Sequence, residues 1–301
     1  MKKKISVVTV TYNAAHLLKA TIESVISQTY KNIEYIIIDG DSTDNTDCLL
    51  RQYNEKIAYW ISETDNGIYD AMNKAIEISS GEWIIFINSG DYFATNDVIE
   101  KIFISEIQSD VDFIYGDYIK SHNGKYTVVR ARPLSLMWQR ISFSHQSLFS
   151  RTSLMKERPF NTKYRVVSDY ENYFKRYMEG RKFQRVSFPI SIFLTGGYSE
   201  INFTRRTYER WRIIRKYHPK QFERNTFYMK LIINHIYEHQ RLQFYNSLRY
   251  FRRIIRNIFR YLKRVLIFWY RPMNRIVFRS SIFLSRIISY GVRLIKRNGN
   301  R

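Results

Sequence analysis

Short apolar runs alternate with helical patterns along the first 90 residues of the chain. The apolar runs have the length of strands and occupy residues 5–11, 33–38, 58–62 and 83–87. Apolar residues recur at helical spacing in the intervening segments 16–28, 43–53 and 68–79. Strands that alternate with helices predict a largely parallel sheet covered by helices on both faces. We therefore expect an α/β fold whose ligands bind beyond the carboxyl ends of the strands.

The pattern continues less regularly up to residue 200. Asn123-Gly124 is a typical two-residue hairpin turn, which predicts that the segments on either side of it pair as strands. The remaining expected elements are strands at 113–115, 126–129 and 186–194, a loop and strand over 142–150, and a helix over 168–179. Gly196-Gly197 closes this part of the chain.

Charge divides the 301-residue chain into two regions. Residues 1–200 contain 24 Lys or Arg and 24 Asp or Glu, whereas residues 201–301 contain 25 Lys or Arg and three acids. The net charge of +22 therefore lies entirely in the last third, while 45% hydrophobic residues suffice for a substantial core. We predict a globular domain over residues 1–203 and a basic helical extension over residues 204–301.

The basic extension has the pattern of amphipathic helices. Residues 250–269 place apolar and aromatic side chains on one face and arginines and lysines on the other, and residues 275–297 repeat this pattern. Such helices lie in the interface of anionic membranes, where each nearby Lys or Arg contributes about 1 kcal/mol. Alternatively, the apolar stripe packs on the globular domain and the arginines are merely solvated. Nucleic acid is not expected as a partner, because the apolar stripe is wide and no nucleic-acid-binding motif accompanies the charge.

The sequence contains few signals for the cellular compartment. No secretory signal peptide is visible, and the longest apolar run of the extension, residues 265–270, is too short to span a membrane. Cys48 is the only cysteine, so no intrachain disulfide can form, which fits a reducing compartment; we expect Cys48 to be a small buried residue. The sequence thus predicts a cytoplasmic protein, peripherally associated with the inner face of the cell membrane.

Acidic loops follow two of the expected strands. The strand at 33–38 runs into Asp39-Gly40-Asp41-Ser42-Thr43-Asp44, and the strand at 83–87 runs into Asn88-Ser89-Gly90-Asp91. An apolar strand that ends in an acidic loop is a common way to build a site for a metal ion and a phosphorylated ligand. No metal-binding cysteine pattern, Ser-His-Asp arrangement or glycine-rich phosphate loop is present in the sequence. The acidic loops are therefore the candidate site.

Four motifs occur in order along the first 91 residues. They are Val7-Val8-Thr9-Val10-Thr11-Tyr12-Asn13, Asp39 to Asp44, Asp65-Asn66-Gly67-Ile68-Tyr69-Asp70-Ala71-Met72-Asn73-Lys74, and Asn88-Ser89-Gly90-Asp91. With these four motifs, the chain resembles the bacterial family 2 glycosyltransferases of the GT-A fold over about residues 4–195. The likeness is greatest to enzymes that assemble capsule, colanic-acid-type exopolysaccharide or O-antigen. It implies a Rossmann-like GT-A catalytic domain with a mixed, mostly parallel sheet.

The resemblance implies a binding site for a nucleotide-diphosphate sugar. In it, Asp39 would accept a hydrogen bond from the nucleobase, typically from N3–H of uracil, and Asp65 would lie near the nucleotide. The residues that the resemblance places at the donor are Thr9, Tyr12, Asn13, Asp39, Asp41, Asp65, Asn73, Lys74, Asn88 and Ser89. Ordinary structural roles stay open for several positions: Asp39 and Asp65 as turn residues, Ser42 or Thr43 as a helix cap, Thr9 as strand-end packing, and Lys74 as a solvated helix residue.

The segment 88–91 is also where the chain departs from the family. The usual Asp-x-Asp has Asn88 in place of its first acid and Gly90 in place of its second, so only Asp91 keeps a carboxylate. In the family a divalent cation, Mg²⁺ or Mn²⁺, stabilises the negative charge on the departing diphosphate. Either Asp91 holds this metal and the diphosphate completes its shell, or metal dependence is weakened. Asp91 as a turn or capping residue is the structural alternative.

Asp169 resembles the catalytic base of the family, because it opens a helix at a suitable distance after the metal loop. Such a base takes the proton of the acceptor hydroxyl as that oxygen attacks the anomeric carbon, and attack opposite the nucleotide inverts the anomeric configuration. The alternative is a capping box formed by Ser168 and Glu171. His145, in the pair His145-Gln146, resembles a motif near the acceptor and is assigned to the site without a defined role.

The resemblance therefore implies an inverting glycosyltransferase that moves a sugar from a UDP-linked donor to a hydroxyl of a lipid-linked bacterial surface glycan. Two alternatives stay open. In one, the protein binds a membrane surface or nucleic acid and retains the fold, but lost catalysis when the acidic pair became Asn88 and Gly90. In the other, the enzyme transfers its sugar to a polyprenyl phosphate.

Overall fold

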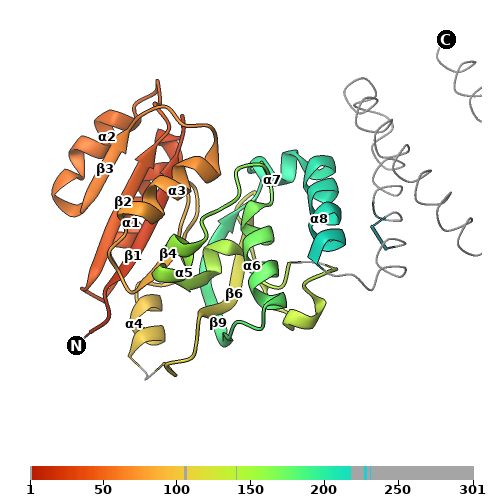
Figure 1. The fold of residues 1–301 in the computed structure, drawn as a ribbon. Coiled ribbons are helices and arrows are strands. Elements are labelled where there is room, and N and C mark those ends of the chain that lie inside the picture. The colour runs from red at the N-terminus through yellow and green to blue at the C-terminus, as the bar shows by residue number, and fades with distance from the viewer. Residues whose placement is uncertain (1, 105–106, 140, 218–226, 229–230, 232–301) are drawn as a thin grey trace, which may run out of the picture. The chain divides into compact units, whose positions relative to one another are not determined.

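The computed structural model describes residues 2–104, 107–139, 141–217, 227–228 and 231 of the chain (Figure 1). All of them belong to one compact unit that runs from Met1 to His235. Residues 232–301 lie outside the described part, and with them both predicted amphipathic segments of the basic extension. The membrane-surface prediction that rests on those segments stays a prediction.

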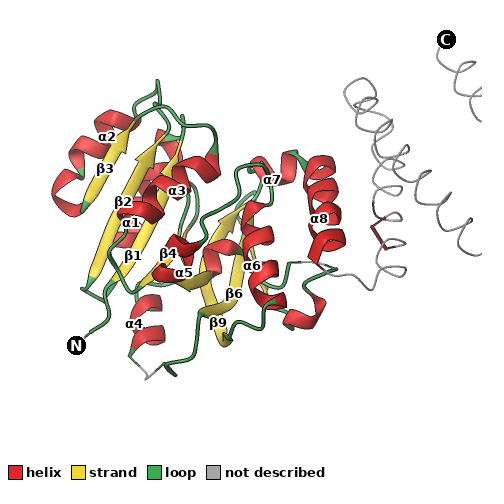
Figure 2. Ribbon diagram, viewed as in Figure 1, coloured by secondary structure: helices red, strands yellow, loops and turns green. Residues whose placement is uncertain are grey.

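The first half of the sheet is parallel. Its strands are β1 (Ile5–Thr11), β2 (Ile33–Asp39), β3 (Tyr59–Ser62) and β4 (Trp83–Phe86), in the spatial order β3-β2-β1-β4 (Figure 2). The connections contain α1 (Ala15–Ile26), α2 (Thr46–Gln52), the 3-10 turn η1 (Asn54–Lys56) and α3 (Ile68–Ile78). β1 is buried at every position because β2 and β4 flank it and helices cover both faces. The strand–helix alternation predicted for these residues is confirmed.

The second half of the sheet is mixed. β6 (Phe113–His122) runs antiparallel to β8 (Leu148–Arg151) and parallel to β9 (Phe183–Leu194), and β8 runs antiparallel to β4. β5 (Tyr92–Phe93) pairs with β9, and β7 (Lys125–Val129) pairs with β6. The remaining elements are α4 (Val98–Phe103), η2 (Leu134–Leu136), η3 (His145–Ser147), α5 (Thr152–Glu157), α6 (Ser168–Met178), α7 (Tyr198–Ile201) and α8 (Phe203–Tyr217).

The predicted hairpin between β6 and β7 is confirmed. Asn123 (φ 48°) and Gly124 (φ 75°) both adopt the left-handed conformation that a two-residue hairpin turn requires. The turn pairs His122 with Lys125 and continues through five registered residue pairs.

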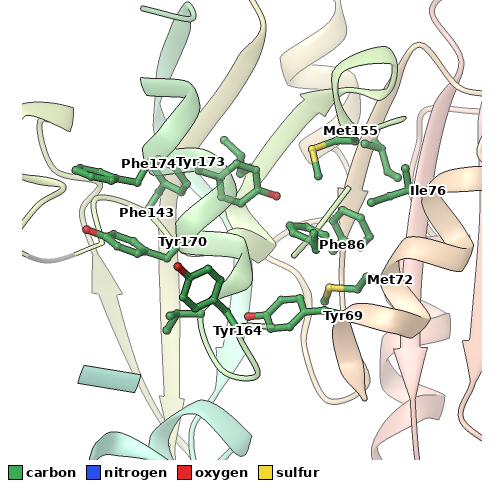
Figure 3. Close-up of a cluster of buried hydrophobic side chains, with 14 of the residues drawn as sticks. Tyr69, Met72, Ile76, Phe86, Phe143, Met155, Tyr164, Tyr170, Tyr173 and Phe174 are labelled. Atoms are coloured by element: carbon green, nitrogen blue, oxygen red, sulfur yellow. The ribbon is translucent and has the colours of Figure 1, made fainter. Parts of the chain in front are cut away.

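Two apolar cores lie on opposite faces of the sheet. Successive strand residues point to opposite faces, so β1 sends Val8 and Val10 into the first core and Ile5 and Val7 into the second. Helices α3, α5, α6 and α8 cover the first core, and α1, α2 and α4 cover the second. Figure 3 shows part of the first core, where Tyr69 projects from α3 toward the aromatic side chains of α6. Helices on both faces of a mixed sheet confirm the expected fold class.

Two local expectations are wrong. Cys48 is exposed on α2 rather than buried. Neither Ser42 nor Thr43 caps α2, because this helix begins only at Thr46, after an N-cap at Asn45.

α8, the first helix of the predicted basic extension, packs on the α/β domain. Its Ile213 and Ile214 are buried in the first core, and its Glu209 accepts hydrogen bonds from the backbone N–H groups of Arg165 and Val166. α8 thus packs on the domain, whereas the segments 250–269 and 275–297, for which packing was the alternative, lie outside the described residues. The boundary between the two predicted domains stays a prediction. Within the described ranges, no helix has the length and apolar composition needed to cross a membrane.

Candidate active site

The acidic loops lie at one edge of the parallel half of the sheet. Thr11, Asp39 and Ser62 end three neighbouring strands and are register partners across them. Beyond β4, the backbone N–H of Ser89 still donates to the carbonyl of Val10 (N···O 3.2 Å). The segments that follow β1, β2 and β4 therefore meet at the carboxyl edge, where sheets of this kind bind ligands.

Asp39 is completely buried and is held by its own loop and the next strand. Its Oδ1 accepts a hydrogen bond from the Ser42 hydroxyl (2.5 Å). Its Oδ2 accepts from the Ser42 backbone N–H (3.0 Å) and from the Ser62 hydroxyl (2.6 Å). These are the contacts of a turn-forming Asp, the ordinary alternative for this residue, and they fix the loop conformation at this edge.

An aromatic ring and a carboxylate flank Gly40. A Cβ atom at this position would lie 2.6 Å from Oδ2 of Asp65 and 3.4 Å from Cδ2 of Tyr12, so a larger residue would displace the Asp65 carboxylate. Oδ1 of Asp65 accepts a hydrogen bond from the Gly67 N–H (2.7 Å), and the Tyr12 side chain is 65% exposed. Tyr12 and Asp65, both predicted at the nucleotide, thus form an exposed ring beside a carboxylate, an arrangement that suits stacking and hydrogen bonding of a planar ligand.

The loops after β1 and β2 are tied together through Asn13. Its backbone N–H donates to the Ser42 hydroxyl (2.7 Å), and its side-chain Oδ1 accepts from the Thr43 N–H (2.8 Å). Asn13 (φ 48°) and Asp41 (φ 64°) adopt the left-handed conformation, which Asn and Asp tolerate better than other residues with side chains. Both therefore lie at the predicted edge, with Asp41 exposed on its loop.

Three residues predicted at the donor have other contacts. Thr9 is buried within the sheet, and its hydroxyl donates to the carbonyl of the residue that follows β4 (2.7 Å). The side-chain amide of Asn73 bonds at both ends to the backbone of Phe160. Lys74 forms an ion pair with Glu63 (2.7 Å). Thr9 and Asn73 are thus occupied by structural contacts, and Lys74 by a charge partner.

The segment after β4 turns sharply at Gly90. This residue has a φ of 96°, which suits glycine, and the Asp91 N–H closes the turn by donating to the Asn88 carbonyl (2.9 Å). The Ser89 hydroxyl lies 3.4 Å from the Ala14 carbonyl, in the loop after β1. The side chains at both ends of the turn are nearly buried, with 9% of Asn88 and 6% of Asp91 exposed.

Asp91 is a buried carboxylate whose hydrogen-bond partners are neutral. Its Oδ2 accepts from Nε2 of Gln146 (2.7 Å), and its Oδ1 accepts from the backbone N–H of Leu194 (3.0 Å). Burial raises the pKa of Asp91 to about 6, and these two hydrogen bonds with the charge of His145 offset only part of that effect. An additional positive charge beside Asp91 would therefore be stabilising.

The residues present at this site fit a cation that takes most of its ligands from water and the substrate rather than from the protein. Each oxygen of Asp91 accepts one hydrogen bond, which leaves acceptor capacity on both for a metal ion. Within the residues that the structure describes, no group of three or more His, Cys, Asp or Glu side chains could hold a metal. Mg²⁺ is commonly bound through one or two carboxylates, with water and substrate phosphates as its other ligands. Asp91 suits that mode.

Asp169 is held by two side chains from distant parts of the chain. Its Oδ2 lies 3.1 Å from Nδ1 of His145, and its Oδ1 lies 2.8 Å from the Tyr69 hydroxyl. On the other side of the imidazole, Nε2 lies 3.2 Å from Nδ2 of Asn88. An ionised carboxylate can only accept, so Nδ1 carries a proton and donates to Asp169. Three predicted site residues are thus brought together.

The pKa of Asp169 lies below its ordinary value. Burial would raise it, since only 7% of the residue is exposed, but the hydrogen bond and charge of His145, followed by the hydrogen bond of Tyr69, outweigh burial. Asp169 is therefore an ionised carboxylate at neutral pH. The capping box considered as an alternative is not formed, because α6 has no side-chain cap and the Ser168 hydroxyl donates to the Asn161 carbonyl (2.9 Å).

Tyr69 and Gln146 were not predicted as site residues. The ring of Tyr69 is buried in the first core (Figure 3), so its pattern on α3 is that of any core aromatic residue. Its hydroxyl nevertheless reaches Asp169. Gln146 bonds to Asp91, and its position directly after His145 was the available signal.

A sequence profile described as Glycosyl transferase family 2 matches residues 6–173, more than half of the chain. The chain belongs to glycosyl transferase family 2. The match ends within α6, just after Asp169, so every loop of the candidate site falls inside it.

Two curated relatives are named as glycosyltransferases. The PGL/p-HBAD biosynthesis glycosyltransferase of Mycobacterium bovis (strain BCG / Pasteur 1173P2) is 30% identical over 173 residues. These residues are 55% of this chain and 66% of the relative, so the match spans just under two thirds of that protein. The UDP-Glc:alpha-D-GlcNAc-diphosphoundecaprenol beta-1,3-glucosyltransferase WfgD of Escherichia coli is 33% identical over 115 residues, 38% of this chain and 45% of that protein.

Solved structures confirm the GT-A fold expected from the sequence. S. aureus TarS 1-349 in complex with UDP-GlcNAc matches with a TM-score of 0.59 at 17% identity, over 81% of this chain and 74% of that chain. The mannosyltransferase PcManGT from Pyrobaculum calidifontis, in complex with GDP-Man and Mn²⁺, matches with a TM-score of 0.56 at 16% identity, over 72% of this chain and 64% of that chain. At these identities the likeness concerns the fold alone.

Proposed function

We propose that the protein is an inverting glycosyltransferase that moves a sugar from a UDP-sugar to a hydroxyl of a lipid-linked glycan. The observation that carries this proposal is the buried His145–Asp169 pair, which Asn88 joins to the loop that contains Asp91. This arrangement supports Asp169 as a base that lies beside a loop suited to binding a cation and a diphosphate. The names of the relatives support the substrates, since WfgD is named for a UDP-Glc donor and a diphosphoundecaprenol-linked acceptor.

Asp169 acts as the general base. As the acceptor oxygen attacks the anomeric carbon, its proton passes to the Asp169 carboxylate, and the bond from that carbon to the diphosphate oxygen breaks. His145 and Tyr69 hold the carboxylate in one orientation, because each engages a different oxygen. Attack from the side opposite the leaving diphosphate inverts the anomeric configuration.

The donor lies along the carboxyl edge of β1, β2 and β4. Tyr12 and Asp65 contact the nucleotide, with Gly40 between them. Asp91 would hold Mg²⁺ or Mn²⁺, which would supply positive charge beside the leaving diphosphate. The Mn²⁺ in the PcManGT complex supports a cation in this fold.

The substitution Asp169→Asn tests this proposal. An amide cannot take the acceptor proton, so we expect kcat to fall by about 10²- to 10⁴-fold, while UDP binding is unchanged. The matched control is Glu171→Gln two residues later on α6, where the carboxylate accepts a hydrogen bond from Tyr217 (2.5 Å) and no catalytic role is proposed. Transfer by the Asp169→Asn protein at the wild-type rate, or a product with the donor's anomeric configuration, would overturn the proposal.

We also propose that the basic region 204–301, with 25 Lys or Arg against three acids after residue 200, holds the enzyme at an anionic membrane surface. The full-length protein should sediment with vesicles that contain phosphatidylglycerol, and binding should fall as salt rises. A variant without residues 250–301 should remain in the supernatant. Equal sedimentation of both proteins would contradict this assignment.

A further inference from the structure

Helix α8 packs beside α6 on the first core and presents a basic surface to solvent (Figure 1). Arg212, Arg215 and Lys216 are all exposed. They are three and four residues apart, so they lie on one side of the helix near its end. Lys175 of α6 adds a fourth cation, because Nζ of Lys175 and Nζ of Lys216 lie 5.6 Å and 4.7 Å from the centroid of the Tyr217 ring. We call these four cations the basic face.

The cations of the basic face lie against aromatic rings. The guanidinium of Arg212 is 5.9 Å from the centroid of the Tyr164 ring. The guanidinium of Arg215 is 5.4 Å from the centroid of the Trp211 ring. Tyr164, Trp211 and Tyr217 in turn belong to the first core or pack against it. The rings therefore hold the charges in defined places on the surface, while the charged groups themselves stay exposed.

The acids closest to this surface are buried and already have partners. Glu209, with 4% exposed, accepts a hydrogen bond from Nε of Arg205 (2.9 Å). Glu171, with 6% exposed, accepts from the Tyr217 hydroxyl (2.5 Å). Among the residues that the structure describes, no member of the basic face forms an ion pair. The charge that this face exposes is therefore positive and uncompensated.

We infer that the basic face lies against an anionic membrane surface, so that the folded catalytic domain itself contacts lipid headgroups. Lys and Arg are attracted to anionic headgroups, and Trp and Tyr are enriched at membrane interfaces. Nucleic acid fits this face less well, because the rings of Tyr164 and Trp211 are covered by arginine and pack on the first core, which leaves little of them to stack on bases.

The basic face has a fixed relation to the proposed base. Asp169 and Lys175 belong to the same helix, α6, and the hydrogen bond from Tyr217 to Glu171 ties α8 to that helix. A membrane at the basic face is therefore held in one orientation relative to Asp169, which presents the active site to acceptors carried by the membrane. This consequence rests on the proposed function, but the membrane contact does not.

Vesicle binding by the full-length protein tests the basic face. The triple variant Arg212→Gln, Arg215→Gln, Lys216→Gln should bind vesicles of phosphatidylcholine and phosphatidylglycerol at least about tenfold more weakly than wild type, since each cation near an anionic surface contributes about fivefold. The single variant Arg212→Gln should lose about fivefold from an exposed position, so the test does not depend on the folding of the triple variant. Unchanged binding by both variants would overturn the inference.

The matched control removes three exposed cations from helices that cover the second core, on the opposite face of the sheet. It is the triple variant Lys19→Gln, Arg51→Gln, Lys101→Gln. The control has the same net charge as the test variant and should bind vesicles like wild type. An equal loss in both triple variants would show an effect of net charge alone and overturn the inference. Arg212→Lys combined with Arg215→Lys retains the charges and should keep most of the binding.

Transfer assays separate the membrane contact from the proposed function. With an acceptor carried in these vesicles, the triple variant of the basic face should raise KM about tenfold, while kcat/KM for a water-soluble acceptor stays within about twofold of wild type. An unchanged KM for the vesicle-borne acceptor would contradict the orienting role. A protein that binds vesicles through this face but transfers no sugar would defeat the proposed function while the membrane contact stands. If the triple variant lost binding to a single-stranded oligonucleotide but not to vesicles, the face would belong to nucleic acid and the inference would be overturned.

Discussion

Asp91 and Asp169 are buried to a similar extent, with 6% and 7% of each residue exposed, yet their pKa values move in opposite directions. The partners of Asp91 are neutral N–H groups, from Gln146 and from the backbone, whereas Asp169 meets the imidazole of His145. Burial alone therefore does not set the charge at this site. In the proposed reaction Asp91 is left to be neutralised by a bound cation, while Asp169 is ionised and ready to accept a proton.

One short element serves both carboxylates. His145 and Gln146 are consecutive residues of η3, and His145 contacts Asp169 while Gln146 contacts Asp91. The position of η3 thus fixes the spacing between the proposed base and the proposed cation ligand. A displacement of this 3-10 turn would disturb both sites at once.

The largest expected effect comes from removing the imidazole. In His145→Ala, Asp169 loses the donor that orients it and the main interaction that opposes burial, so we expect kcat to fall by about 10²- to 10³-fold. Steady-state transfer kinetics measure this. His145→Asn is the matched control, because its amide N–H can replace Nδ1–H as a donor to Asp169 and should restore part of the rate. If His145→Ala kept the wild-type kcat, the imidazole would not be what makes Asp169 functionally different from Asp91.

The sequence predicted the parallel half of the fold because several of its elements are long enough to show a period. β1, α1, β2 and α3 each span seven or more residues, and their apolar positions repeat at strand or helix spacing. β5 has two residues and α4 has six, which is too few for either period to appear.

In the candidate site, too, only contacts between residues close in sequence could be predicted. Asp39 contacts Ser42, three residues away, so its loop can be recognised locally. Tyr69 and Asp169 are 100 residues apart and meet only because α3 and α6 pack on the same face of the sheet. No local pattern encodes that contact, and the resemblance therefore identified Asp169 and His145 but not Tyr69.

The second prediction concerns stability and uses Asp91. Its native pKa of about 6 lies above its ordinary value of 3.8, so the native state binds more protons than the unfolded state between these two pH values. Stability therefore falls as pH rises from about 4 to about 6, and stays lower above that. In the Asp91→Asn variant, this fall in stability with rising pH should be absent. We expect the variant to exceed wild type by up to about 3 kcal/mol at pH 7 in metal-free buffer, and to match it near pH 4.

Urea unfolding between pH 4 and pH 8 measures this difference. The matched control is Asp97→Asn, because hydrogen bonds from Thr95 and Lys101 lower the pKa of that exposed carboxylate. This substitution should bring no gain in stability at neutral pH. If wild-type stability did not change between pH 4 and pH 6, the neutral partners of Asp91 would be sufficient to compensate its charge.

The smallest expected effect comes from Tyr69→Phe. The single hydroxyl proton of Tyr69 is shared between Oδ1 of Asp169 (2.8 Å) and the Val166 carbonyl (3.0 Å), so its loss removes only part of one hydrogen bond to the base. Without this donor the pKa of Asp169 rises, and the acid limb of the pH profile of kcat/KM should move to higher pH, with about a fivefold fall in rate at neutral pH. Tyr170→Phe is the matched control, since its hydroxyl donates to the Met137 carbonyl (2.9 Å) instead. Coincident pH profiles for Tyr69→Phe and wild type would mean that His145 alone distinguishes Asp169 from Asp91.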